Sequence, residues 1–122
     1  DDEVVRTDRL IIKNLKMNKV LQIVQDIGQQ PVLSFGNSSG DVSMHMYTIS
    51  NNVYRSEAFM LIADDSVRDY GDEERVAPLR AQWEERGFRV ISMKNDFATI
   101  YGDDVVKTGS FRWAEEFAEE AE

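Results

Sequence analysis

The residues best suited to chemistry in this sequence stand in one short polar segment, GNSSGD, at positions 36–41. Asn37 and Asp41 lie four residues apart, so an amide oxygen and a carboxylate can turn toward one point. Such oxygen ligands suit Mg²⁺, which keeps several waters and takes further ligands from substrate phosphate and other carboxylates. Gly36 and Gly40 would let the backbone approach a ligand closely. The segment is therefore a candidate site for Mg²⁺ and phosphate.

Lys19 strengthens this interpretation, although the loop alone leaves another one open. It precedes Asn37 by 18 residues, at the start of the helix that leads into the preceding strand. Helix start and strand end would lie on the same side of a sheet, where an ammonium can pair with phosphate or restrain a carboxylate. Lys13 and Lys16 are nearby alternatives. The loop is equally compatible with a plain turn in which Asp41 caps the next helix.

The elements that must position these residues alternate between strand and helix. An i, i+3, i+4, i+7 pattern with Asn18 as N-cap and Gly28 as stop predicts a helix over 18–27. The apolar run 32–35 is typical of a strand covered on both faces. One strand or a short hairpin is predicted over 4–13, and further strands over 58–65, 88–94 and 97–102. Further helices are predicted over 41–49 and 77–86, the last with Pro78 in its first turn.

This alternation predicts an α/β fold with a mostly parallel, Rossmann-like sheet and flanking helices. The absence of a repeat or a linker indicates one domain over 1–122. Residues 108–122 carry Trp113 and Phe117 on one face and glutamates on the other, and we expect an acidic amphipathic helix there.

Composition excludes several classes of function. The chain has 122 residues, no cysteine and a net charge of −9, with 42% hydrophobic and 30% charged residues. The negative charge argues against nucleic acid and anionic membranes as partners. No apolar run approaches the roughly 18 residues of a membrane span, and no signal peptide pattern opens the chain. The cytoplasm is the expected compartment.

Three segments together resemble a known family. They are NKVLQIVQDIGQQPVLSFGNSSGDVSM, AFMLIADD and GFRVISMKNDFATIYG, within residues 10–102. This pattern looks like the C-terminal half of a phosphatase-type member of the haloacid dehalogenase (HAD) superfamily. The resemblance implies a HAD-type sheet and Mg²⁺-dependent hydrolysis of a small phosphate monoester through an aspartyl-phosphate.

The resemblance also assigns roles to residues. Asn37 and Asp41 stand at the motif that helps to hold Mg²⁺, and Lys19 stands at the basic motif that steadies the nucleophile and the phosphate. Ser38 and Gly40 would lie near the bound phosphate. Ser39 departs from the Asp often found at its position, which is not an expected ligand.

The nucleophile of this family has no counterpart in the chain. It belongs to an Asp-x-Asp-x-Thr segment, and neither Asp8 nor the pair Asp64-Asp65 has those surroundings. The resemblance therefore implies a C-terminal portion that is inactive alone and needs the missing N-terminal half, from the same gene or a second chain. The alternatives are a non-catalytic α/β module that binds metal or phosphate, and a structural interaction domain.

Three further features are better explained by structure than by chemistry. His45 is the single histidine and is expected to pack, although a catalytic or metal-binding role stays open. Met44 and Met46 are expected to fill the core. Asp64 and Asp65 either cap the end of a strand or contact the substrate.

Overall fold

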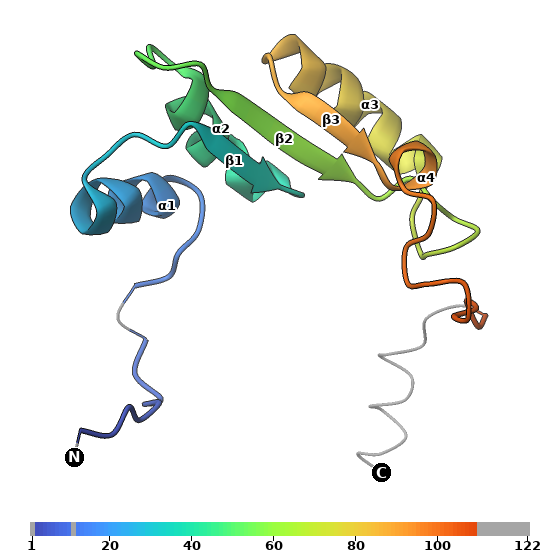
Figure 1. Ribbon diagram of the computed structural model, residues 1–122, viewed down its shortest axis with the longest axis horizontal. Helices are drawn as coiled ribbons and strands as arrows, with labels where there is room; N and C mark the ends of the chain where they lie inside the picture. The colour runs from blue at the N-terminus through green and yellow to red at the C-terminus, as the bar shows by residue number, and fades with distance from the viewer. Residues whose placement is uncertain (1, 11, 110–122) are drawn as a thin grey trace. The chain divides into compact units, whose positions relative to one another are not determined.

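The computed structural model describes residues 2–10 and 12–109 (Figure 1). They form a mixed α/β structure with flanking helices and a three-stranded parallel sheet in the order β1-β2-β3. The strands are β1 (Leu33–Gly36), β2 (Glu57–Ile62) and β3 (Arg89–Ser92). The coarse prediction of an α/β fold with a parallel sheet is confirmed.

The chain divides into two compact units, Asp1–Ala58 and Phe59–Glu122, and each is described by itself. The single domain over 1–122 stays a prediction. The helix expected over 108–122 lies, from residue 110 onward, outside the described part of the chain.

The first unit places two helical segments around β1. Helix α1 (Met17–Gln22) continues into a π-helical turn, η1 (Ile23–Ile27), which Gly28 ends in a left-handed conformation with φ 72°. After β1, a 3₁₀ turn, η2 (Ser39–Asp41), leads into α2 (Val42–Ile49). Helix α2 packs against both β1 and α1. The predicted helix stop at Gly28 is confirmed.

Two predictions for the start of the chain are wrong. Residues 4–10, 12 and 13 form no strand, since no neighbouring strand offers them ladder hydrogen bonds in the described chain. The N-cap of α1 is Lys16, at φ 51°, rather than Asn18. Asn18 is the second residue of the helix, and its exposed side chain donates through Nδ2 to the carbonyl of Lys13 at 2.9 Å.

Strand β1 is covered on one face by α2. Successive side chains of a strand point to opposite faces. Ser34 is buried, whereas Leu33 and Phe35 are 55% and 62% exposed. The prediction of burial on both faces is therefore wrong for the described chain, because α2 covers only the face that carries Ser34. The other face of β1 is apolar and exposed.

The second unit is built on the parallel pair β2 and β3, in which Met60 lies opposite Val90. Helix α3 (Glu73–Glu85) packs against β3, beside which it is drawn in Figure 1. Met60, Ile62, Trp83 and Phe88 are buried and form the core of this unit.

Helix α3 begins four residues earlier than the sequence predicts. Asp72 caps it, with its side chain accepting from the amide of Arg75 at 3.1 Å. Pro78 consequently lies in the helix interior rather than in its first turn. The capping by Asp72 and the burial of Trp83 outweigh the hydrogen bond that proline cannot donate.

The end of the second unit also differs from the prediction. Strand β3 stops at Ser92, and a short helix α4 (Met93–Asp96) follows. Ser92 caps this helix by accepting from the amide of Asn95 at 3.0 Å. Residues 97–102 form no strand.

Candidate functional site

The centre of the candidate site is the carboxylate of Asp41, which is only 5% exposed. It lies at the end of the loop that follows β1 (Leu33–Gly36). Its Oδ2 accepts from the backbone N–H groups of Asn37 at 3.1 Å and Ser38 at 3.2 Å. The hydroxyl of Ser38 donates to the same oxygen at 3.3 Å. The polar loop therefore folds around a buried negative charge.

Lys19 is the partner of the second carboxylate oxygen. Its ammonium, on α1, forms an ion pair and hydrogen bond with Oδ1 of Asp41. The Lys19 side chain keeps 25% of its surface exposed, whereas that of Asp41 keeps 7%. The two residues that sequence reasoning had linked thus meet directly.

These contacts stabilise the charged form of Asp41. Burial works to raise the pKa of its carboxyl, but it is outweighed by the hydrogen bond from Lys19, the backbone donors of Asn37 and Ser38, and the charge of Lys19. The net result is a pKa below the usual value. Asp41 is consequently an anion at neutral pH.

Gly36 makes room for this carboxylate. A Cβ atom at position 36 would lie 2.6 Å from both Cβ and Oδ2 of Asp41. The expectation that Gly36 admits a ligand is thus corrected, because the space that it leaves is filled by Asp41 itself. A Cβ at Gly40 would lie 3.4 Å from the nearest atom, Oγ of Ser38, which is an ordinary contact.

The other predicted site residues lie on the outside of the loop. Asn37 and Ser38 are exposed, and Gly40 is half-buried. Asn37 and Asp41 supply the oxygen types that Mg²⁺ prefers but only two side chains, where the ion needs six ligands. No cluster of three or more metal-binding side chains occurs in the described residues. The types of ligand atom at the site therefore suit Mg²⁺, but their number does not, so further ligands would have to come from other residues, water or substrate.

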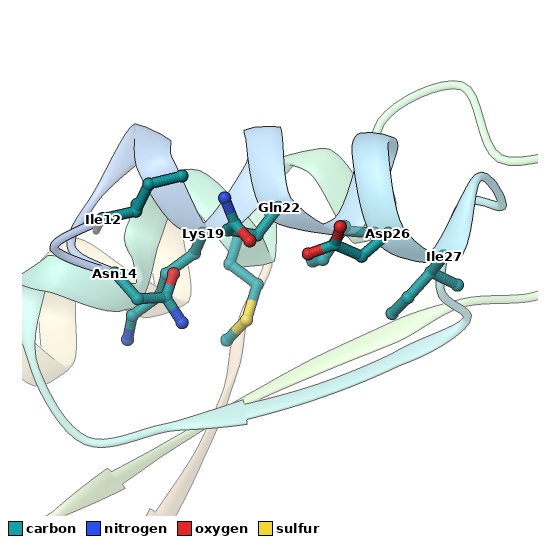
Figure 2. A pocket seen from close by; sticks show the side chains of 8 residues that line it. Ile12, Asn14, Lys19, Gln22, Asp26 and Ile27 are labelled. Carbon is teal, nitrogen blue, oxygen red and sulfur yellow. The ribbon is translucent and has the colours of Figure 1, made fainter. Parts of the chain in front are cut away.

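A cavity of about 490 Å³ lies beside Lys19 in the first unit. Figure 2 shows Lys19, Gln22 and Asp26 in a row along one helical face, with Asn14 next to Lys19. Apolar side chains complete its lining. Sequence reasoning missed this cavity, although the spacing 19, 22 and 26 of polar residues on a helix was a readable signal.

In the second unit, the carboxylates of Asp64 and Asp65 accept hydrogen bonds from backbone amides. Asp64 accepts from the hydroxyl of Ser92 at 2.5 Å and the amide of Lys94 at 2.9 Å. Asp65 accepts from the amides of Val67 and Arg68, at 3.0 and 2.7 Å. Donors from Arg68 and Val67, and the charge of Arg68, lower the pKa of Asp65 against burial. Both carboxylates therefore serve the capping role that the sequence had left open.

Arg68 is the structural residue that the sequence reasoning overlooked. Its Nε donates to Asp65 at 2.6 Å, and its two terminal nitrogens donate at 2.9 Å to four backbone carbonyls. Those carbonyls belong to residues 93, 94, 97 and 98. All five guanidinium donors are thus used, which ties the segment after β3 to the loop after β2.

His45 is part of the interior of the first unit. Its Nδ1 lies 2.6 Å from Oγ of Ser34, and both residues are buried. The predicted packing role is confirmed by this burial. Met44 is half-buried and Met46 is 37% exposed, so the expectation that both fill the core is wrong for Met46.

Comparison with known proteins gives no assignment, since neither a family model nor a curated protein matches the sequence. None of the helices in residues 2–10 and 12–109 has the length and apolar character that crossing a bilayer requires.

Proposed function

We propose that this chain carries the C-terminal half of the active site of a HAD-type, Mg²⁺-dependent phosphohydrolase that acts on a small phosphate monoester. One observation carries the proposal: the ion pair between Lys19 and the buried carboxylate of Asp41, built on the loop after a parallel strand. Loops at the carboxyl ends of parallel strands are the usual place for ligands in open α/β sheets.

The residues have separate tasks in this function. Asp41 and Asn37 would be ligands of Mg²⁺, an ion that neutralises charge on the transferred phosphoryl group when bound. Lys19 fixes the Asp41 carboxylate and adds a positive charge beside the phosphate. Ser38 and Gly40 would lie next to that phosphate, while the amide and hydroxyl of Ser38 hold the Asp41 carboxylate in place.

The proposal requires further site residues, including the nucleophile, that the described part of this chain does not supply. The described chain supplies one carboxylate and one amide for Mg²⁺, and no aspartate in the context of a HAD nucleophile. The exposed apolar face of β1, with Leu33 and Phe35, supports this requirement, since such faces are normally covered. The partner would be the N-terminal half of the same fold.

The product of the complete open reading frame tests this function. We expect it to contain an Asp-x-Asp-x-Thr segment upstream and to hydrolyse p-nitrophenyl phosphate only with Mg²⁺. Lys19→Met should abolish this activity, whereas Lys13→Met, which removes an exposed lysine outside the site, should retain it. An open reading frame without that segment and without activity would contradict the proposal.

The second candidate is a non-catalytic module that binds phosphate. It is favoured by the contacts of the buried Asp41 carboxylate. One oxygen pairs with Lys19 and the other accepts from the amide of Asn37, so both have partners without a metal ion. Such a module would bind inorganic phosphate with no dependence on Mg²⁺, and its complete open reading frame would release no phosphate from esters.

A further inference from the structure

A small cavity in the second unit has no role in the proposed chemistry. It is lined by the loop after β2 and by the segment after α4. Its volume of about 170 Å³ is below the roughly 300–1,000 Å³ of pockets that hold drug-sized molecules. A water molecule takes roughly 30 Å³ in the liquid, so the cavity has room for about six non-hydrogen atoms. It therefore suits a very small ligand.

The cation of this cavity is Lys107, whose ammonium is held in place. Its Nζ donates to the carbonyl of Ser66 at 2.6 Å and lies 4.7 Å from the centre of the Tyr70 ring, within cation–π range. The Tyr70 hydroxyl in turn donates to the carbonyl of Thr108 at 2.7 Å. Among the described residues no carboxylate pairs with Lys107, so its positive charge is not neutralised by an ion pair there.

Arg68 also lines the cavity but has no donor left for a ligand. Its five N–H groups are used by Asp65 and four backbone carbonyls, and Asp65 also balances its charge. Lys107 is therefore the cation of the described lining that a ligand can pair with. None of the described lining residues is an acid. A group with a single negative charge suits this lining better than a phosphate, which carries about two.

The rest of the wall is largely apolar and is shaped by a turn. The amide of Gly102, at φ 103°, donates to Oγ1 of Thr99 at 2.7 Å, and the amide of Val105 donates to the carbonyl of Gly102 at 3.3 Å. The aliphatic side chains of the lining are Val67, Ile100, Val105 and Val106. The three valines are 54–82% exposed, so a hydrocarbon chain that covers them removes apolar surface from water.

We propose that this cavity binds a short aliphatic carboxylate of about three to five carbon atoms. The carboxylate pairs with the ammonium of Lys107, and the hydrocarbon chain packs against the valines and Ile100. One cation beside an apolar wall matches a molecule with one charged end and an apolar tail. The inference is independent of the proposed function, because the cavity lies in the second unit and includes neither Lys19 nor Asp41.

A series of probes with growing chains tests the site. Acetate, propionate and butyrate are titrated at constant ionic strength into the ¹⁵N-labelled 122-residue chain, and the NMR amide signals of residues 99–107 are followed. We expect the affinity to rise about threefold to fourfold with each added CH₂ group. 1-Butanol, which lacks the charge, should bind at least about tenfold more weakly than butyrate. Equal affinities of the three acids, equal affinities of butanol and butyrate, or no shift at all would overturn the proposal.

Variants then locate the effect. Lys107→Gln should weaken butyrate binding by at least about tenfold and leave 1-butanol binding unchanged. Lys94→Gln is the matched control, because Lys94 is an exposed lysine of the same unit that pairs with Glu73 outside the cavity lining. Loss of butyrate affinity in Lys94→Gln but not in Lys107→Gln would contradict the assignment.

The apolar wall is tested separately. Val105→Ser keeps Lys107 with its contacts to Ser66 and Tyr70, so it tests the wall even if Lys107→Gln alters the loop. It should weaken the binding of both butyrate and 1-butanol by about threefold or more. Unchanged binding of both probes would show that the valines do not hold the chain.

Inorganic phosphate separates a carboxylate site from an unspecific anion site. It carries more charge than butyrate but no hydrocarbon chain, so it should bind to this cavity more weakly. If phosphate shifts the signals of residues 99–107 as strongly as butyrate does at the same concentration, the cavity attracts any anion and the proposal fails.

Discussion

The ammonium of Lys19 and the carboxylate of Asp41 form an ion pair that joins two segments 22 residues apart in the chain. The pair connects the first turns of α1 with the loop after β1. It is largely shielded from solvent on the Asp41 side, where backbone amides hold the other carboxylate oxygen. The geometry of the candidate site therefore depends on these two residues together.

Removal of the lysine should destabilise the fold. Lys19→Met leaves the buried Asp41 carboxylate without its cation, and we expect a loss of about 1–3 kcal/mol in the free energy of unfolding. Urea denaturation followed by circular dichroism measures it. Lys13→Met, at an exposed position, should change stability by no more than about 0.5 kcal/mol. Equal effects of the two substitutions would show that the ion pair contributes nothing.

The pH dependence of stability should report on Asp41. Its pKa in the folded chain lies below the ordinary value of 3.8, so the unfolded state binds the proton more tightly. The stabilisation is therefore fully present above about pH 5 and is lost as the pH falls through the folded pKa. The difference in unfolding free energy between the wild type and Asp41→Asn should stay constant from about pH 7 to 5 and shrink below that. A difference that grows on acidification would have the wrong sign.

Gly36 should tolerate no side chain. A Cβ there would overlap Asp41 at 2.6 Å, so Gly36→Ala should cost about 1–3 kcal/mol of stability and disturb the Lys19–Asp41 pair. Gly40→Ala is the matched control in the same loop, with its nearest contact at 3.4 Å. Thermal denaturation should show Gly40→Ala to be neutral or slightly stabilising. The reverse order of the two variants would refute the packing described here.

Arg68 should be irreplaceable by lysine. The ammonium of a lysine offers three donors and no planar fork, so Arg68→Lys cannot maintain the bonds to Asp65 and to four carbonyls. We expect a loss of about 2–3 kcal/mol in unfolding free energy and faster amide exchange in residues 93–98. Arg80→Lys, in an exposed i, i+4 pair with Glu84, should change little. Normal protection of these amides in Arg68→Lys would show that the hydrogen bonds of the guanidinium are not needed to hold residues 93–98.

Local patterns predicted the elements around the site well. The α/β class, the stop at Gly28, the strand before the polar loop and the meeting of Lys19 with Asp41 all follow from periodicity, glycine positions and spacing. These features depend on residues close in sequence or on the general geometry of parallel sheets.

The features that the sequence failed to predict depend on contacts between residues far apart in the chain. The β-branched segment 4–13 has strand propensity but no strand beside it in the described chain. Arg68 binds carbonyls 25 to 30 residues away, two of them in the segment 97–102, which forms no strand. The burial of Ser34 beneath His45, with Leu33 and Phe35 exposed, likewise depends on which face α2 covers.

The central claim is that Asp41 is a Mg²⁺ ligand in a phosphohydrolase site. The most direct measurement is the Mg²⁺-dependent release of phosphate from p-nitrophenyl phosphate by the product of the complete open reading frame, compared between Asp41→Asn and Asp103→Asn. Asp103 is an exposed aspartate outside the site. We predict a loss of at least about 100-fold for Asp41→Asn and unchanged activity for Asp103→Asn. Equal Mg²⁺-dependent activity in both variants would contradict the claim.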